Sequence, residues 1–240
     1  MRQPPRLQLI PPNVILQHED ISDSRLPGLR YSLTASQTLK DPIQVVIVGE
    51  RYVVVDGHHR FRALVDLGAK WIPVQISDLS DVRMSHWYHD LPWSSTKEPF
   101  WRIVHDQYLW SETNVRRLGI VKLPNRNVCI LYAPEPIDEA IYRLSKSCRI
   151  ENGNRTEEPP HTTPWICYDG LTIMDILNCA QAGRVLPPGV TRFIVTDRVL
   201  NLNVPLSLIR RDHPPDLTSY YRSAYRGRRY VESVIVAQTD

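Results

Sequence analysis

One short block, Asp56-Gly57-His58-His59-Arg60, holds the residues whose types and spacing best suit the binding of phosphate. It lies where an apolar run stops and a helical pattern starts, and the first N–H groups of a helix have no partners within it. Gly57 leaves room for a ligand beside the backbone, and the Arg60 guanidinium can hold two phosphate oxygens. Together with His58 and His59, these residues are predicted to bind phosphate, and Asp56 is predicted to hold a divalent metal. The alternative is that Asp56 only caps the helix.

The elements that must position this block are short and clearly bounded. Gly49-Glu50 separates two runs rich in valine, Asp56-Gly57 ends the second run, and Gly68 follows the helical pattern. This order predicts a β-hairpin, a tight turn, a helix and a further strand. The expected strands cover residues 43–48, 51–55 and 71–76, and the expected helix covers residues 58–67. Elsewhere we expect a strand and its return within 7–16, a loop over 17–28, helices over 29–39 and 172–182, and strands over 192–195 and within 198–208.

The composition of the whole chain is typical of a globular protein. Its 240 residues are 42% hydrophobic and 23% charged, with a formal net charge of +3. This mild surplus suits an anionic small molecule and is smaller than that of a dedicated DNA-binding domain. The four cysteines form no metal-binding pattern, and no apolar run is long enough for a signal peptide or a membrane span. We therefore expect a cytoplasmic protein that does not enter a membrane.

The segment Arg51–Ile76, RYVVVDGHHRFRALVDLGAKWIPVQI, resembles the ParB/sulfiredoxin superfamily, in which this strand–turn–helix binds nucleotide phosphates. Sulfiredoxins place a reactive cysteine directly before the His-Arg pair, where this chain has His58. Partition proteins carry an arginine-rich box followed by a helix-turn-helix domain, for which this chain shows no clear pattern. The third branch, the free L-serine kinases, fits best.

Four blocks in the same order carry the resemblance to the serine kinases, and in particular to those of siderophore pathways. They cover nearly the whole chain. The blocks are Gln17-His18-Glu19, Asp56 to Arg60, Trp87-Tyr88-His89, and the stretch from Pro188 to Phe193 that continues through Arg198 to Leu206.

The resemblance implies a role for each of these residues. Glu19 would be the general base that accepts the proton of the serine hydroxyl, and Asp56 would hold Mg²⁺. Arg192 can pair with the serine carboxylate, and Thr191 can donate its hydroxyl. Trp87 and His89 would line the serine site, with packing as the alternative.

The expected architecture is α/β with a mixed sheet: a ParB/sulfiredoxin-like nucleotide-binding lobe over residues 1–80 and a mixed α/β lobe over residues 81–240, with the active site in the cleft between them. The expected reaction transfers a phosphoryl group from ATP or ADP, with Mg²⁺, to free L-serine. The product, O-phospho-L-serine, is expected to serve siderophore or diaminopropionate-type biosynthesis. The sequence does not indicate the oligomeric state.

Two rival interpretations keep the fold and change the function. A nucleotide-dependent DNA-binding protein is suggested by the tail, in which Arg222, Arg226, Arg228 and Arg229 alternate with tyrosines. A regulatory protein that binds nucleotide without kinase activity is the other rival. We regard nucleic acid as the less favoured partner because such a tail is more often a solvated helix face.

Overall fold

The computed structural model describes residues 5–22, 24–91, 115–123, 127–134, 136–148, 150, 154–213, 216–217, 229–231 and 234–235. The chain divides into two compact units, and each is discontinuous in sequence. The first unit comprises Met1–Gln17, Ile21–Arg83 and Phe193–Asp240, and the second comprises His18–Asp20 and Met84–Arg192.

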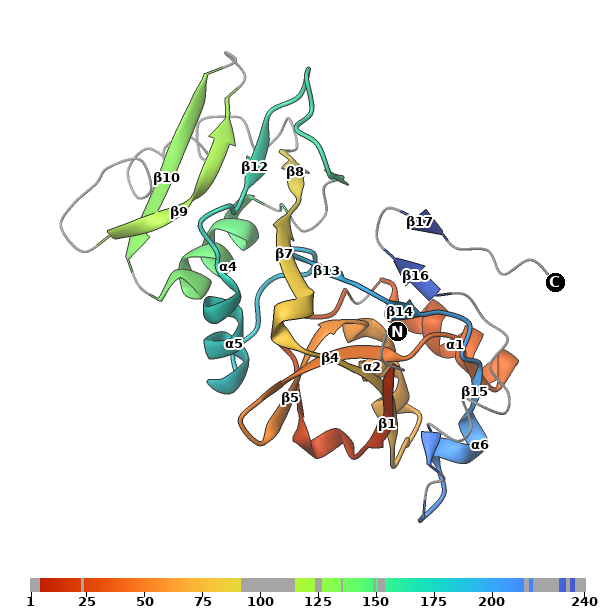
Figure 1. The fold of residues 1–240 in the computed structure, drawn as a ribbon. Coiled ribbons are helices and arrows are strands. Elements are labelled where there is room, and N and C mark those ends of the chain that lie inside the picture. The colour runs from red at the N-terminus through yellow and green to blue at the C-terminus, as the bar shows by residue number, and fades with distance from the viewer. Residues whose placement is uncertain are drawn as a thin grey trace. The chain divides into compact units, whose positions relative to one another are not determined.

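A mixed five-stranded sheet, in the order β1-β6-β4-β5-β2, forms the centre of the first unit (Figure 1). β4 runs parallel to β6 and antiparallel to β5, β1 is antiparallel to β6, and β2 is parallel to β5. This arrangement confirms the expected α/β class. The elements are β1 (Arg6–Ile10), the 3₁₀ turn η1 (Pro12–Val14), β2 (Ile15–Leu16), α1 (Leu26–Ser36), β3 (Thr38–Leu39), β4 (Ile43–Val48), β5 (Arg51–Asp56), α2 (His58–Asp66), β6 (Ile72–Ser77) and the 3₁₀ turn η2 (Leu79–Asp81).

The predicted order of hairpin, turn, helix and strand over residues 43–77 is confirmed to within one residue at each end. The helix expected over residues 29–39 is displaced, because α1 begins at Leu26 and ends at Ser36. Pro27 lies in its first turn, where a missing N–H costs no helical hydrogen bond. Gln37 ends the helix in the left-handed conformation, with φ of 51°, and β3 follows it.

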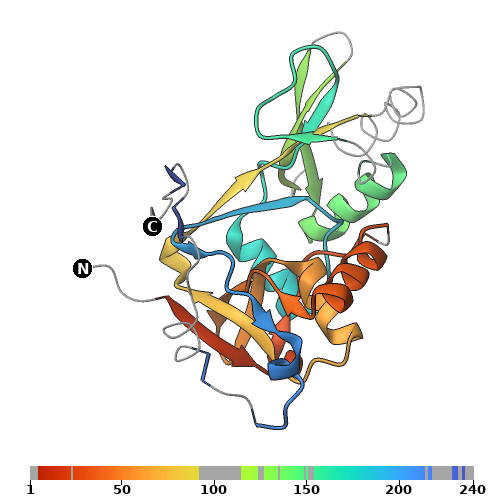
Figure 2. The ribbon, with the colours of Figure 1, turned by 90° about the vertical axis from the view of Figure 1, so that its right-hand side faces the viewer.

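Residues near the C-terminus complete the core of the first unit. Val199, Leu202, Val204 and Leu206 are buried in the same apolar cluster as Leu7 and other N-terminal residues. Figures 1 and 2 both show the blue C-terminal elements alongside the red and orange N-terminal ones. These elements are β14 (Arg198–Val199), β15 (Val204–Pro205), α6 (Leu206–Ile209), β16 (Arg229–Val231) and β17 (Val234–Ile235).

The strand expected within residues 198–208 is present, but it is divided into the short strands β14 and β15, which the helical turn α6 follows. Asp197, Asn201 and Asn203 have φ values of 59°, 57° and 53°. Asn and Asp are the residues other than glycine that tolerate this left-handed conformation best. Each of the three therefore bends the chain where a regular strand would have to stay extended.

The second unit contains a five-stranded sheet in the order β10-β9-β12-β8-β11 and, among its described residues, two helices. The helix expected over residues 172–182 is confirmed as α5, where Thr172 and Asp175 form a capping box. The strand expected over residues 192–195 is also confirmed. The elements are β7 (Val82–His86), which begins in the first unit, β8 (Tyr88–Asp90), β9 (Val115–Lys122), β10 (Val128–Pro134), α4 (Ile137–Cys148), β11 (Arg155–Thr156), β12 (Trp165–Cys167), α5 (Ile173–Gln181) and β13 (Thr191–Val195), which ends in the first unit. Within the described residues, no helix combines the length and the apolar character that crossing a bilayer requires.

Candidate phosphate and carboxylate sites

The turn between β5 and α2 forms the predicted phosphate loop. Gly57 has φ of 102°, and its carbonyl accepts the first helical hydrogen bond from the Phe61 N–H at 2.8 Å. No side chain caps the helix among the described residues. A Cβ at Gly57 would stand 3.0 Å from Arg60 Nη2 and 3.1 Å from Ile43 Cδ1, so the Arg60 guanidinium lies directly against the glycine. The positive φ favours glycine here, and a larger residue would also push the Arg60 and Ile43 side chains aside.

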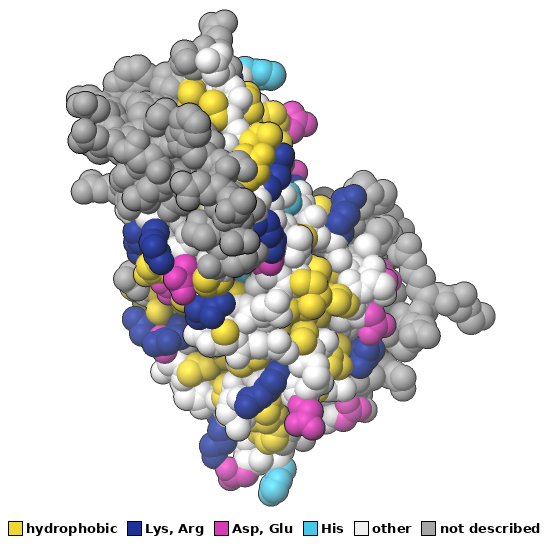
Figure 3. Space-filling model, turned by 90° about the vertical axis from the view of Figure 1, so that its left-hand side faces the viewer, with side chains coloured by type: hydrophobic (Ala, Val, Ile, Leu, Met, Phe, Trp, Pro, Cys, Tyr) yellow, Lys and Arg dark blue, Asp and Glu magenta, His cyan; other side chains and the backbone are white. Residues whose placement is uncertain are grey.

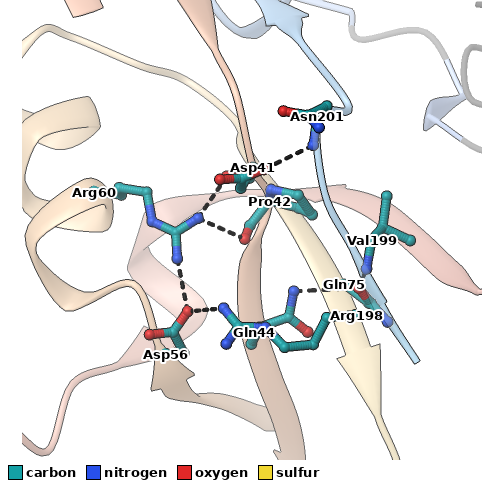
Figure 4. A network of polar contacts seen from close by, with 9 residues as sticks. All are labelled: Asp41, Pro42, Gln44, Asp56, Arg60, Gln75, Arg198, Val199 and Asn201. Atoms are coloured by element: carbon teal, nitrogen blue, oxygen red, sulfur yellow. Dashed lines mark hydrogen bonds and ion pairs between the residues drawn. The ribbon is translucent and has the colours of Figure 1, made fainter. Parts of the chain in front are cut away.

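Two arginines share the Asp56 carboxylate (Figure 4). Arg60 Nη2 donates to Asp56 Oδ2 at 2.7 Å, and Arg198 Nη2 donates to the same oxygen. Arg60 also uses Nη1, which donates to the backbone carbonyls of Asp41 at 2.9 Å and Pro42 at 3.2 Å. Asp56 therefore does not act as a simple helix cap. It orients two guanidinium groups at the start of α2.

Buried glutamines fix β14 beside this carboxylate. Gln75 accepts the Val199 N–H at 2.8 Å and donates Nε2 to the Asp197 carbonyl at 2.9 Å. Gln44 donates Nε2 to Gln75 Oε1 at 3.2 Å. Buried polar side chains that bond in this way specify one arrangement, because leaving any of them unpaired is costly.

The two histidines of the loop differ in their surroundings. His58 is buried, and desolvation together with the charges of His59 and Arg60 lowers its pKa to about 3. It is therefore neutral at ordinary pH and brings no positive charge to a phosphate. His59 accepts the Ser22 N–H on Nε2 at 3.0 Å. Gln17 Nε2 donates to the His58 carbonyl at 3.3 Å.

Glu19, the predicted general base, lies in the second unit. Its Oε1 accepts the Gly189 N–H at 2.8 Å, and its Oε2 accepts the Thr191 hydroxyl at 2.8 Å. Burial raises the pKa of the Glu19 carboxyl, while the bonds from Gly189 and Thr191 and the charge of Arg155 act in the opposite direction. A carboxylate with a raised pKa is a stronger base than an ordinary one.

His18 extends this arrangement by one more residue. Its side chain is fully buried, and Nε2 lies 3.0 Å from the Thr191 Oγ1. Because that hydroxyl gives its proton to Glu19, it accepts from His18, which assigns the proton of the ring to Nε2. The chain from His18 through Thr191 to Glu19 therefore holds the carboxylate in one orientation.

The Trp87 ring lies against two guanidinium groups. Arg192 is 4.8 Å and Arg155 is 5.2 Å from the ring centroid. Arg192 also pairs with Glu157 at 2.8 Å. Arg155 lies against Gly189, since a Cβ there would stand 1.6 Å from its Nη1. These contacts place two positive charges and an indole in the unit that holds Glu19, next to the backbone that binds its carboxylate.

His89 is buried in the second unit, and its Nε2 has no hydrogen-bond partner among the described residues. Desolvation and the charge of Arg155 lower its pKa to about 4. Its ring lies 6.0 Å from that of Tyr168. The residue is thus a neutral imidazole at ordinary pH with an unused polar atom.

Asp56 is the one carboxylate that the sequence analysis assigns to Mg²⁺. No cluster of three or more His, Cys, Asp or Glu residues occurs in the part of the chain that the structure describes. Mg²⁺ at nucleotide sites is commonly held by one or two carboxylates together with phosphates and water. Asp56 fits that limited role, although its Oδ2 is shared by two guanidinium groups.

The structure therefore groups the predicted residues into two sets. Asp56, Gly57 and Arg60 adjoin one another, as predicted, and Thr191 bonds to Glu19. Sequence reasoning assigns no role to Arg155 or Arg198. Arg198 lies in a block that carries the family resemblance, whereas no local pattern marks Arg155.

The basic tail proposed as a nucleic-acid contact lies largely outside the described residues, which include only Arg229 and Tyr230 of it. On the face shown in Figure 3, basic side chains are interspersed with acidic and apolar ones.

Comparison with known proteins agrees with the sequence analysis. The family model of the ParB N-terminal domain matches residues 6–89. The ATP-dependent L-serine kinase SbnI of Staphylococcus aureus is 26% identical over 219 residues, which are 86% of this chain and 85% of that protein. The structure of SbnI with C-terminal truncation has a TM-score of 0.71 at 24% identity, covering 90% of this chain and 93% of the other. A free serine kinase in complex with AMP has a TM-score of 0.65 at 18% identity, covering 85% and 93%. The predicted resemblance and fold class are confirmed.

Proposed function

Starting from a chain with the fold of the free serine kinases, we propose that this protein transfers a phosphoryl group from ATP or ADP to the hydroxyl of free L-serine. The product is O-phospho-L-serine. The observation that carries the proposal is Glu19, a carboxylate oriented by two hydrogen bonds and made more basic by burial. The same unit also contains Arg155 and Arg192, whose positive charges suit the carboxylate of an amino-acid substrate.

Glu19 is proposed to accept the proton of the serine hydroxyl as its oxygen attacks the terminal phosphorus. The new O–P bond forms while the bond from phosphorus to the bridging oxygen breaks, and the electron pair leaves with the nucleotide. Such a reaction needs little covalent work from the protein and depends on alignment and charge neutralisation. The raised pKa of Glu19 brings its basicity closer to that needed near neutral pH.

The loop at Gly57 to Arg60 is proposed to bind the phosphates of the donor. The N-terminus of α2 contributes its N–H groups and dipole. Asp56 would hold Mg²⁺, which when bound neutralises part of the phosphate charge. Since His58 is neutral and buried, we assign the positive charge of this loop to arginine rather than to histidine.

Free serine carries a carboxylate and an ammonium group, and the second unit can recognise both. Arg192 suits the carboxylate because a guanidinium pairs with it through two hydrogen bonds. Arg192 pairs with Glu157, whose side chain is 63% exposed. An exposed ion pair of this kind is weak, so a substrate carboxylate can replace Glu157 as the partner of Arg192. Trp87 supports Arg192 through its ring face, and His89 offers an unused nitrogen. Thr191 is proposed to act mainly through Glu19, since its hydroxyl donates there.

The phosphate of the product is a good leaving group on the β-carbon of serine. An enzyme that replaces it with a nitrogen nucleophile would make a diaminopropionate-type amino acid. We therefore propose that the product feeds siderophore or related biosynthesis, as the resemblance in sequence suggests.

The test is phosphoryl transfer by the purified full chain with Mg²⁺, free L-serine and either ATP or ADP, with O-phosphoserine measured by mass spectrometry. Glu19→Gln keeps the shape of the side chain and removes the base, so kcat is expected to fall by about 10²- to 10⁴-fold. Glu158→Gln, at an exposed position of the same unit, is the matched control and should retain activity.

Two results would contradict the proposal. Product formation by Glu19→Gln at the wild-type rate, with an unchanged melting curve, would remove Glu19 as the base. Nucleotide binding without product from either donor would favour a regulatory protein over a kinase.

A further inference from the structure

We propose that Arg198 is a phosphate-binding residue of the nucleotide site, supplied to the α2 loop by β14. The inference rests on the proposed nucleotide-binding function. Arg198 and Asp56 are 142 residues apart in sequence, yet both lie in the first unit and their side chains bond directly. Figure 4 shows the two arginines converging on this carboxylate from different elements.

The backbone around Arg198 is held in place on both sides. The Val199 N–H and the Asp197 carbonyl bond to the two ends of the Gln75 amide. The Asn201 N–H donates to Asp41 Oδ1 at 2.7 Å. Three hydrogen bonds within five residues fix the position from which the Arg198 side chain extends.

The irregular backbone of this segment supports the same conclusion. Asp197 and Asn201 both take the left-handed conformation, with φ of 59° and 57°. Such conformations persist where the surrounding contacts determine them, and they are frequent at functional sites. Here they aim one arginine at the loop and then return the chain to the core at Leu202.

Arg60 and Arg198 differ in how many of their guanidinium nitrogens bond to the protein. Arg60 is turned toward the protein, since its Nη1 donates to two backbone carbonyls and its Nη2 to Asp56. Arg198 donates through Nη2, and its buried Nε has no hydrogen-bond partner among the described residues. Both Nη atoms of Arg60 thus already bond to protein acceptors, whereas Arg198 keeps a donor whose bonding is incomplete without a further acceptor.

The charges favour an anionic acceptor. One carboxylate, Asp56, faces two guanidinium groups. A phosphate oxygen beside them would balance the second guanidinium, and a guanidinium is well matched to phosphate geometry. Asp56 then acts as a positioning residue that holds Arg198 toward the phosphates.

The experiment compares the affinities of adenosine, AMP and ADP for the full chain by calorimetry, without serine. Arg198→Gln is expected to weaken ADP binding by about tenfold to a hundredfold, the effect of losing a charge-assisted hydrogen bond, while adenosine affinity changes less than about twofold. Arg198→Lys, which keeps the charge, should recover part of the ADP affinity. Arg62→Gln, on the exposed side of the same α2 helix where it pairs with Asp66, is the matched control and should bind all three ligands normally.

Equal losses of affinity for adenosine and ADP would overturn the proposal, because they would indicate a purely structural arginine. Unchanged ADP affinity in Arg198→Gln would overturn it as well. If the wild type binds ADP but makes no phosphoserine, the kinase proposal fails while these affinities still decide the role of Arg198. If the wild type binds no ADP, both proposals are wrong.

Discussion

Opposing effects on one carboxylate define the chemistry of Glu19. Burial raises its pKa, and the hydrogen bonds from Gly189 and Thr191 lower it. The bonds also fix the direction in which the carboxylate faces. As the proposed base, Glu19 combines orientation with basicity, and each of these two properties can be changed by a single substitution.

Thr191→Val removes the hydroxyl with little change of volume. The charged form of Glu19 then loses a hydrogen bond, so its pKa rises further. Because the base must be deprotonated to work, the acidic limb of the activity profile should move to higher pH, by about one to two pH units. The measurement is kcat/KM for serine between pH 5 and 9.

Thr191→Ser restores the hydroxyl and is the control, with a profile close to that of the wild type. If the valine variant keeps the wild-type acidic limb, the hydroxyl does not govern the ionisation of Glu19.

At the scale of the element, the start of α2 depends on Gly57, which is constrained in its backbone conformation and in the space around it. Gly57 has a positive φ, and its missing side chain leaves space that the Arg60 guanidinium occupies. Gly68, just beyond the same helix, also has a positive φ, but a Cβ added there would meet no other atom within 4 Å. Substitutions at Gly57 and Gly68 therefore distinguish the cost of a positive φ from the effect of local crowding.

Gly68→Ala should destabilise the protein by about 1–2 kcal/mol, the cost of a left-handed alanine, without changing nucleotide affinity. Gly57→Ala should cost more and should weaken ADP binding by about tenfold, because the new methyl group displaces Arg60. Thermal unfolding and ADP titration of both variants provide the measurement. Equal ADP affinities in the two variants would show that the space beside Gly57 has no role in binding.

The elements that can be predicted from sequence are those with strong local patterns. The valine-rich runs before and after Gly49-Glu50, and the helix that follows Gly57, are placed correctly because each is bounded by turn residues. Within the segment from Arg198 to Leu208 one strand is expected and two short ones occur, because Asn201 and Asn203 have positive φ and interrupt the extended chain. The role of Arg198 could not be predicted, because its partner is distant in sequence.

At the scale of the whole molecule, each unit buries a neutral histidine. Desolvation, mainly, lowers the pKa of His58 to about 3 and that of His89 to about 4. In the unfolded chain both have ordinary values near 6.5. As the pH falls below about 6.5 the unfolded chain takes up protons first, so the folded state loses stability until the folded pKa is reached.

His58 should account for about 2 kcal/mol of lost unfolding free energy between pH 7 and pH 5. Denaturant unfolding at the two pH values measures this difference, and His58→Gln should reduce it by that amount. His161→Gln, at an exposed position, should leave the pH dependence unchanged. A wild-type stability that is equal at pH 5 and pH 7 would contradict the buried, neutral state of these histidines.

The core of the first unit joins residues from opposite ends of the chain, and this has a consequence during biosynthesis. A ribosome releases the N-terminal strands long before Val199 and Leu202, which pack against them. The nascent chain must therefore keep an incomplete apolar core, a state that chaperones recognise, while the second unit is being translated. The loop gains its second guanidinium only after the second unit has been translated, so an interrupted polypeptide that ends before β14 would carry the sequence of the phosphate loop without its full complement of charge.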